Sequence, residues 1–286
     1  MTVTANQICI TASRLDKEII RTPMLEAPLL SRHLGCDLFL KMECLQHTSS
    51  FKARGALNAM LNLSDKQRKN GVITMSAGNH AQAVAYHAER MGIPATIVMP
   101  AQTPFAKVAR TRAFGANVVL EGRNLNECEG TVNHLIDDHA LTLIHPYDDE
   151  LVMMGQGTAG LEMLTDAPDI DILVVPIGGG GLIGGIATIA RDMRPNIKIY
   201  GVQTELYPTM KLAVAGKTIF CGGETLAEGI AVKKPGVATL PVVQSLVDDI
   251  LLVNERQLEW SVGALIEQQR IVAEGAGAAG VEPKVN

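Results

Sequence analysis

Aromatic and basic residues are scarce in this chain, and their scarcity limits the partners that it can bind. Only 3% of the 286 residues are aromatic, and the formal net charge at pH 7 is -5. Binding to nucleic acid requires a basic surface, and binding to single strands adds aromatic side chains that stack on bases. The sequence has no basic run with interleaved aromatic residues. It therefore predicts no nucleic-acid partner.

Cysteine and histidine motifs are also missing. The five cysteines are scattered without a C-x-x-C pair, and the seven histidines form no H-E-x-x-H pattern. These spacings favour neither a disulfide framework nor a zinc site, and they suit a reducing compartment. The first 20 residues lack the basic, apolar and small-residue regions of a signal peptide. We therefore expect a cytoplasmic protein.

No uninterrupted hydrophobic run is long enough to suggest a membrane span. The longest uncharged stretch, residues 172–190, has 19 residues but contains Pro176 and the four glycines from Gly178 to Gly181. A membrane helix needs about 20 apolar residues, and this glycine content makes a poor helix. The stretch is better interpreted as a buried strand, a loop and a helix, and we expect no membrane partner.

What the sequence does contain is a regular alternation of short apolar runs and helical patterns. Such a rhythm predicts an α/β fold with mainly parallel sheets flanked by helices. We expect two interleaved domains: residues 1–52 and 146–286 form the larger, and residues 53–145 the smaller. The strands are predicted at residues 37–42, 72–75, 95–99, 117–120, 141–144, 172–175, 197–203 and 250–253.

The glycine run from Gly178 to Gly181 is the strongest functional signal. It follows a predicted strand and leads into a predicted helix. Glycines leave backbone N–H groups accessible, and a helix N-terminus favours a phosphate. The simpler alternative is a flexible turn. A second alternative is a nicotinamide site, because residues 179–184 match G-x-G-x-x-G and Glu205 follows at about the ~20-residue distance of that fingerprint.

Two other junctions carry polar groups. Residues 76–80, SAGNH, follow a strand, and their amides could bind a carboxylate or a ring hydroxyl, although Ser76 or Asn79 could simply cap a helix. Lys52 follows two serines at a helix start, where a cation is slightly misplaced, although most lysines are simply solvated. We expect all three junctions to meet at the carboxyl edges of parallel strands, where α/β folds place ligands.

A lysine amine, a phosphate loop and an amide suit pyridoxal phosphate. The motifs SSFKARGA, SAGNHAQAVA, GQGTAGLE and VPIGGGGLIGGIA resemble fold-type II pyridoxal-phosphate enzymes, which are tryptophan-synthase-β-like, and most closely the short threonine/serine dehydratases. The resemblance implies pyridoxal 5'-phosphate as cofactor and Lys52 as the Schiff-base lysine and catalytic base. It also implies cofactor contacts from Phe51, Asn79, Gly178, Gly179, Gly180, Gly181, Leu182 and Glu274, and substrate contacts from Ser76, Ala77, Gly78 and His80.

The same resemblance implies a reaction. L-threonine or L-serine would give a 2-oxo acid and ammonia in a homo-oligomeric lyase. Related serine racemases have a serine at the position of Ala77, and because alanine has no exchangeable proton, Ala77 indicates a lyase. Some relatives bind a divalent metal where this chain has Gln203, so we expect no metal.

The resemblance ends near Gly280. Relatives continue with a helix and a strand whose Ser-Gly-Gly-Asn-like turn contacts the pyridine nitrogen, and nothing in residues 281–286 replaces that turn. An impaired or non-catalytic member of the family is therefore the main alternative to an active dehydratase. A nicotinamide-dependent oxidoreductase is the less favoured one.

Overall fold

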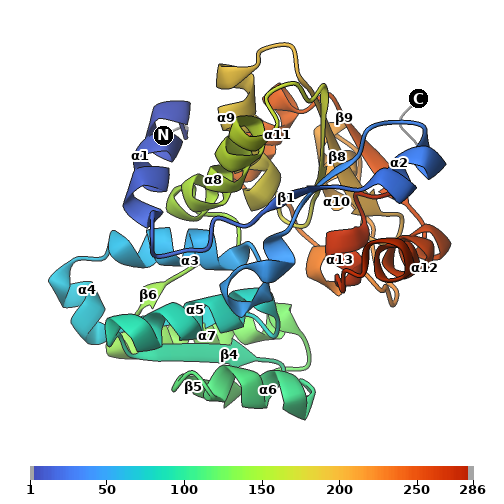
Figure 1. The fold of residues 1–286 in the computed structure, drawn as a ribbon. Helices are drawn as coiled ribbons and strands as arrows, with labels where there is room; N and C mark the ends of the chain where they lie inside the picture. The colour runs from blue at the N-terminus through green and yellow to red at the C-terminus, as the bar shows by residue number, and fades with distance from the viewer. Residues whose placement is uncertain (1–2, 283–286) are drawn as a thin grey trace.

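The structure is a computed structural model, and it describes residues 3–282. The chain forms two lobes, which lie one above the other in Figure 1. Each lobe is built on its own parallel sheet. The predicted α/β fold is confirmed, whereas the predicted domain boundaries stay a prediction. Residues 283–286, part of the segment expected to offer no substitute for the C-terminal turn, lie outside the described residues.

The lower lobe holds a four-stranded sheet in the order β5-β4-β3-β6. All neighbouring strands are parallel, and Val72 pairs with Ala95 and Thr142. The strands are β3 (Val72–Met75), β4 (Ala95–Met99), β5 (Asn117–Leu120) and β6 (Thr142–Leu143). The helices of this lobe are α4 (Asp65–Asn70), α5 (Asn79–Met91), α6 (Phe105–Arg112) and α7 (Leu125–His139).

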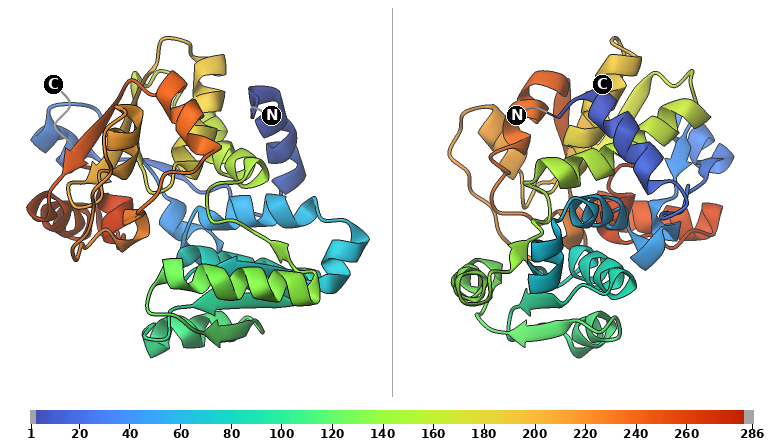
Figure 2. Two further views of the ribbon diagram at one scale, coloured as in Figure 1. Left: turned by 180° about the vertical axis from the view of Figure 1, so that it is seen from behind. Right: turned by 90° about the vertical axis from the view of Figure 1, so that its left-hand side faces the viewer.

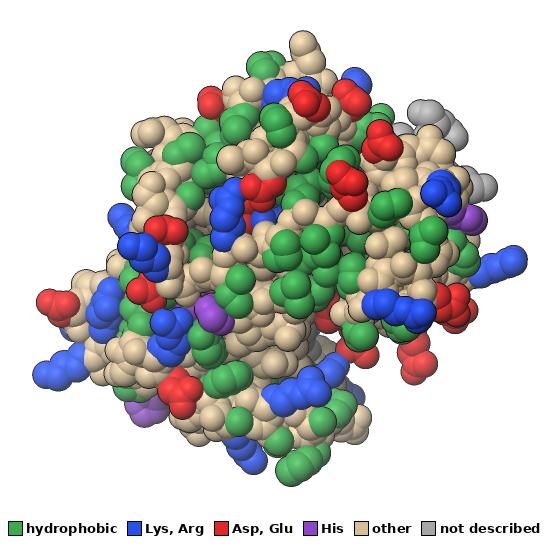
Figure 3. Space-filling model, viewed as in Figure 1, with side chains coloured by type: hydrophobic (Ala, Val, Ile, Leu, Met, Phe, Trp, Pro, Cys, Tyr) green, Lys and Arg blue, Asp and Glu red, His purple; other side chains and the backbone are tan. Residues whose placement is uncertain are grey.

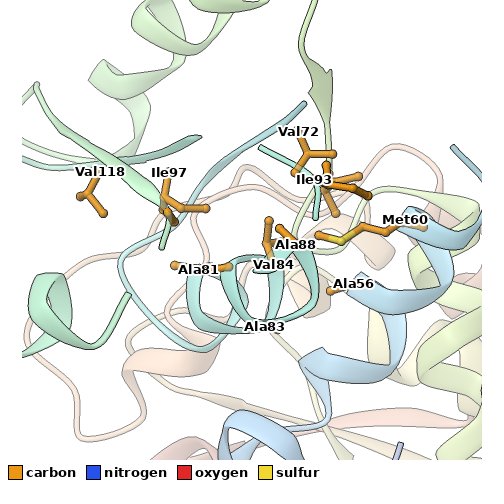
Figure 4. Packing of buried hydrophobic residues seen from close by; sticks show 14 of the residues in the cluster. Ala56, Met60, Val72, Ala81, Ala83, Val84, Ala88, Ile93, Ile97 and Val118 are labelled. Carbon is orange, nitrogen blue, oxygen red and sulfur yellow. The ribbon is translucent and has the colours of Figure 1, made fainter. Parts of the chain in front are cut away.

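Small side chains let α5 pack closely in the core of this lobe. Figure 4 shows Ala81, Val84 and Ala88 of α5 facing Ile97 of the sheet and Met60 of the neighbouring helix. All five side chains are almost completely buried. Apolar burial contributes about 25 cal/mol per Å² removed from water, so this packing holds α5 against the sheet.

The upper lobe holds a three-stranded parallel sheet in the order β7-β8-β9. Its strands are β7 (Ile172–Pro176), β8 (Lys198–Thr204) and β9 (Asp249–Val253). Figure 2 shows this lobe from two further sides. Its helices are α8 (Glu150–Asp166), α9 (Gly181–Met193), α10 (Thr209–Val214), α11 (Thr239–Leu246), α12 (Glu255–Ala264) and α13 (Gly275–Ala278). The short turn η3 (Glu228–Ile230) precedes α11, and the short turn η4 (Leu265–Gln269) follows α12.

The N-terminal segment reaches the boundary between the lobes. It comprises α1 (Ala5–Leu15), the antiparallel pair β1 (Met24–Glu26) and β2 (Phe39–Lys41), α2 (Pro28–Leu34), two 3-10 turns η1 (Glu43–Leu45) and η2 (His47–Ser49), and α3 (Lys52–Leu61). Helix α3 packs against α8 of the upper lobe and α5 of the lower. Close approach to α8 requires glycine, since a Cβ at Gly155 would lie 2.6 Å from the Arg54 carbonyl oxygen.

The predicted strands agree with the observed ones, but one expectation about Lys52 is wrong. The strand before it, β2, belongs to the antiparallel pair, and both turns η1 and η2 separate that strand from α3. Lys52 therefore does not lie at the carboxyl edge of a parallel strand. Within residues 3–282, no helix combines the length and the hydropathy that crossing a bilayer requires.

Candidate active site

Lys52 is the first residue of α3, and it interacts electrostatically with Glu274 of the upper lobe and His80 of the lower. Its Nζ donates a hydrogen bond to the carbonyl oxygen of Pro146 at 2.6 Å and lies 5.2 Å from the centroid of the Phe51 ring. Burial lowers the pKa of Lys52 to about 8, although the nearby Glu274 carboxylate opposes this shift. At pH 7 the neutral amine is therefore far more abundant than in a solvated lysine.

The glycine run forms the turn between β7 and α9. Gly180 has φ +101°, which a residue with a side chain rarely adopts, and Gly181 is the first residue of α9. A Cβ on Gly179 would overlap the ring of Tyr147, and one on Gly181 would lie 2.9 Å from the Tyr147 carbonyl oxygen. The glycines therefore allow the segment around Tyr147 to pack directly against the turn.

The backbone amides of this turn are available to a ligand. Among the contacts within residues 3–282, no N–H of residues 178–182 donates to a protein acceptor. These amides surround the positive end of the 13-residue helix α9. The turn thus has the donors of an anion site. Leu182 can contribute only its amide, because its side chain packs against the core of the upper lobe.

Residues 145–147 bring the lysine and the glycine turn together. Pro146 accepts the hydrogen bond from Lys52, and the next residue, Tyr147, packs on Gly179 and Gly181. Sequence reasoning missed this segment. It directly follows the expected strand at residues 141–144, so the rule that ligands bind at carboxyl ends of parallel strands could have found it.

The small-residue loop lies at the carboxyl end of β3, as expected. Its Gly78 N–H donates to Ser76 Oγ at 3.3 Å, and a Cβ on Gly78 would meet no atom within 4 Å. Ala77 packs partly against the core of the lower lobe. Helix α5 then begins at Asn79, so the first amides of this helix, which have no acceptor within the helix, directly follow Gly78.

His80 is buried and held in one orientation. Its Nε2 donates to the carbonyl oxygen of Ile144 at 2.9 Å, and its Nδ1 has no partner among the described residues. Burial and the charge of Lys52 lower the pKa of His80 to about 3, so the ring is neutral at pH 7. Because a carbonyl only accepts, the proton is on Nε2 and the Nδ1 lone pair is the free group.

Asn79 and Glu274 connect the two lobes. The Asn79 Nδ2 donates to Glu274 Oε1 at 2.8 Å. Loss of hydration raises the pKa of Glu274, while the hydrogen bond from Asn79 opposes the increase. The two residues for which the resemblance implied cofactor contacts thus pair with each other, and the Glu274 carboxylate lies close enough to Lys52 to act on its pKa. Their role as cofactor contacts stays a prediction.

A buried ion network lies behind Lys52, on the opposite side of α3, and was not predicted. Arg54 is fully buried and donates to Glu43 Oε1 and Glu162 Oε1, each at 2.7 Å. Lys41 donates to Glu162 Oε2 at 2.5 Å. These pairs raise the pKa of Arg54, so that it is a permanent cation. The network fixes α3, and with it Lys52, against α8.

Gln203, the residue on which the expectation of no metal was based, makes internal contacts. It is completely buried; its Nε2 donates to the Ile177 carbonyl oxygen and Thr209 Oγ1, and its Oε1 accepts from the Lys211 N–H. Within residues 3–282, no three His, Cys, Asp or Glu side chains are close enough to hold a metal ion together. The absence of a required metal stays a prediction.

The site defines a class of protein: an α/β enzyme that combines an amine of lowered pKa with a glycine turn whose unpaired amides suit an anion. Comparison with known families identifies which one. The family described as pyridoxal-phosphate dependent enzymes matches residues 15–283, and the chain belongs to it.

Individual relatives agree with this assignment. The chain is 45% identical over 278 residues to the L-threonine ammonia-lyase of Thermotoga maritima, covering 96% of this chain and 69% of that protein. It superimposes on the processed form of threonine deaminase isoform 2 from Solanum lycopersicum with a TM-score of 0.92 and 35% identity, over 98% of this chain and 80% of the other. It superimposes on maize serine racemase with a TM-score of 0.95 and 34% identity, over 98% and 86%.

The described residues fit the cofactor of this family. Pyridoxal phosphate presents an aldehyde and a phosphate, and the structure offers Lys52 and the unpaired amides of the glycine turn. Glu205, which the nicotinamide alternative would use, does lie directly after β8. Geometry alone therefore leaves both cofactors open, and the family decides for pyridoxal phosphate.

Proposed function

We propose that this protein is a pyridoxal-phosphate-dependent ammonia-lyase that converts L-threonine or L-serine to a 2-oxo acid and ammonia. The observation that carries this proposal is the position of Lys52, whose amine has a lowered pKa and is connected through Pro146 and Tyr147 to the glycine turn. The names of the relatives above support the reaction and the substrate.

Lys52 would act as the base. The chemistry that bound pyridoxal phosphate supplies is withdrawal of electrons from the α-carbon of an amino acid attached through its amine. The neutral Lys52 Nζ can then accept the α-proton, and its pKa of about 8 places this transfer near working pH. The ammonium formed on Lys52 Nζ can return that proton to the β-hydroxyl, which would leave as water. The released enamine would tautomerise to the imine, and one water molecule would hydrolyse the imine to the 2-oxo acid and ammonia.

The remaining residues would bind and orient. The amides of residues 178–182 would hold the phosphate, while Phe51, Asn79 and Glu274 would line the ring. The amides at the start of α5, with Ser76 and Gly78, would bind the substrate carboxylate. His80 is buried beneath them, so it would support this loop through Ile144 and offer Nδ1 as an acceptor.

Ala77 favours elimination over racemisation. A racemase needs a second proton donor on the other face of the α-carbon, and the alanine methyl group carries no exchangeable proton. We expect no detectable D-threonine or D-serine from the L-amino acids. The Ala77→Ser variant supplies a hydroxyl at this position and tests the assignment: appearance of D-serine would support it.

The proposal is tested by trapping and by product analysis. Purified protein is mixed with pyridoxal phosphate and reduced with borohydride, and peptide mass spectrometry then locates the pyridoxyl group; we expect it on Lys52 and expect none in Lys52→Ala. L-threonine should give equal amounts of 2-oxobutanoate and ammonia. Cofactor attachment without product would favour the non-catalytic alternative, and no attachment would overturn the proposal.

We also infer a cytoplasmic homo-oligomer without nucleic-acid or membrane partners. Figure 3 shows hydrophobic side chains gathered across the middle of one face. Among the strongly exposed apolar residues are Val237 and Val272, at 85% and 80%. Light scattering gives the mass of the assembly, and a monomer at micromolar concentration would contradict the inference.

A further inference from the structure

A second layer of contacts holds the glycine turn from behind. The carbonyl oxygen of Gly179 accepts two hydrogen bonds, from Thr239 Oγ1 at 2.6 Å and from the Gly236 N–H at 3.1 Å. Thr239 is completely buried and is the first residue of α11. Its hydroxyl therefore connects the start of one helix to the turn that begins another.

Asp148 holds the segment that supplies these donors. Its carboxylate accepts from the Val237 N–H at 2.8 Å and from the Ala238 N–H at 2.7 Å. The hydroxyl of the preceding residue, Tyr147, donates to the Lys234 carbonyl oxygen at 3.1 Å. Two adjacent residues thus fix the backbone of residues 234–238, and the carboxylate also faces the positive end of α11. We call Tyr147, Asp148 and Thr239 the clasp.

The clasp determines where a ligand-binding amide points. In a trans peptide the C=O and N–H of one unit point in opposite directions. Because the Gly179 carbonyl oxygen is held by Thr239 and Gly236, the Gly180 N–H of the same unit points away from the clasp. A peptide between two glycines rotates easily when nothing holds it, so the two hydrogen bonds select one of its orientations.

We infer that Thr239 and Asp148 are positioning residues for the cofactor phosphate, acting through the Gly179–Gly180 peptide. This inference rests on the proposed role of the glycine turn. The inference predicts that loss of the clasp weakens binding of a phosphorylated ligand. Binding of the same ligand without its phosphate should stay unchanged. A role in overall stability would affect both ligands alike.

The experiment compares pyridoxal 5'-phosphate with pyridoxal. Equilibrium titration gives the Kd of each ligand for the wild-type protein and for Thr239→Val, which keeps the shape of the side chain and removes its hydroxyl. We expect the Kd for pyridoxal phosphate to rise roughly tenfold, as for one lost hydrogen bond, and the Kd for pyridoxal to change less than about twofold. Thr239→Ser should restore the wild-type value. Asp148→Asn keeps one acceptor oxygen, so it should raise the Kd for pyridoxal phosphate less than Asp148→Ala does.

A matched control lies on α9. Thr188 Oγ1 also donates to a backbone carbonyl oxygen, that of Gly184, at 2.8 Å. Thr188→Val should leave the Kd for both ligands unchanged. Equal weakening of both ligands in Thr239→Val would overturn the inference while leaving the proposed function intact. A wild-type protein that binds pyridoxal and its phosphate with the same Kd would contradict the phosphate role of the turn and the inference together.

Discussion

Lys52 and Arg54 are two cations on one helix, two residues apart, in opposite electrostatic situations. Arg54 is enclosed by the carboxylates of Glu43 and Glu162, and these pairs raise its pKa. Lys52 has a carbonyl oxygen as hydrogen-bond partner, and burial lowers its pKa to about 8. One side of α3 thus stabilises a permanent charge, and the other destabilises a charge that chemistry needs to remove.

The comparison teaches that position on the helix sets the role of each cation. Side chains two residues apart on an α-helix point in directions that differ by about 200°. Lys52 therefore faces the ligand site, and Arg54 faces α8. The rigid pairing of Arg54 holds the helix in place while the amine of Lys52 remains free to change its protonation state. Substitutions of Arg54 and Lys52 test this division directly. Two others, at Ser49 and Lys107, test the turn before α3 and an exposed ion pair for contrast, and the four follow in order of decreasing expected effect.

Arg54→Met removes the buried cation and leaves Glu43 and Glu162 without their shared partner. Breaking one member of a buried network costs about 3–5 kcal/mol, so we expect a loss of that size in the free energy of unfolding, measured by denaturant titration. Arg54→Lys should recover little, because lysine cannot make the paired contacts of a guanidinium. Arg90→Met, which removes an exposed pair with Glu18, is the control and should cost less than about 1 kcal/mol. A loss of similar size in both would contradict the role of the network.

Lys52→Met should stabilise the cofactor-free protein at neutral pH. The pKa of Lys52 is about 8 in the folded state against 10.5 for the unfolded reference, so at pH 7 folding requires a charge in an unfavourable site. As pH rises from 8 to 10.5, the native amine loses its proton before the unfolded one, and the wild-type protein gains stability. We expect the variant to be more stable by up to about 3 kcal/mol at pH 7. The difference should disappear near pH 10.5.

The control for this substitution is Lys66→Met, in which an exposed lysine is replaced. Its effect on the free energy of unfolding should stay within about 0.5 kcal/mol, both at pH 7 and near pH 10.5. If Lys52→Met is less stable than the wild-type protein at pH 7, the amine is better stabilised than its surroundings indicate, and its proposed role as a base weakens.

Local signals in the sequence predicted the strands and the glycine turn, but not the partners of these two cations. Short apolar runs bounded by glycine and proline determine strands such as β3 and β4, and consecutive glycines reveal a turn. The pair between Arg54 and Glu162 joins residues 108 positions apart, and no local pattern encodes it. The expectation about the Lys52 junction was wrong because alternation predicts a strand and does not say whether its neighbour runs parallel. The role of Glu274 could be proposed only from the family, since its contact with Asn79 crosses between the lobes.

Ser49→Gly tests the turn that leads into Lys52. Thr48 and Ser49 have φ of 58° and 59°, in the left-handed region, where a side chain costs about 1–2 kcal/mol. Glycine removes this cost but loses more conformational entropy on folding. We therefore expect the free energy of unfolding, measured by thermal unfolding, to rise by about 0.5–1 kcal/mol. Ser13→Gly, inside α1, should have the opposite sign. A loss at both positions would show that the Ser49 side chain makes a contribution larger than the backbone strain.

Lys107→Ala should have the smallest effect, because its ion pair is the exposed counterpart of the buried network. Lys107 of α6 and Glu228 of η3 join the two lobes at 2.6 Å, with side chains 38% and 73% exposed. Figure 3 shows basic and acidic side chains on the two sides of a notch between the lobes. Solvent screens such a pair, so we expect a loss of about 0.5 kcal/mol that disappears in 1 M salt, where the screening length is about 3 Å. The loss caused by Arg54→Met should persist in the same salt, because its partners lie where ions do not reach. A salt-independent effect of Lys107→Ala would mean that the Lys107 side chain contributes through packing and not through its ion pair with Glu228. The contrast between buried and exposed charges would then not explain how the lobes are held together.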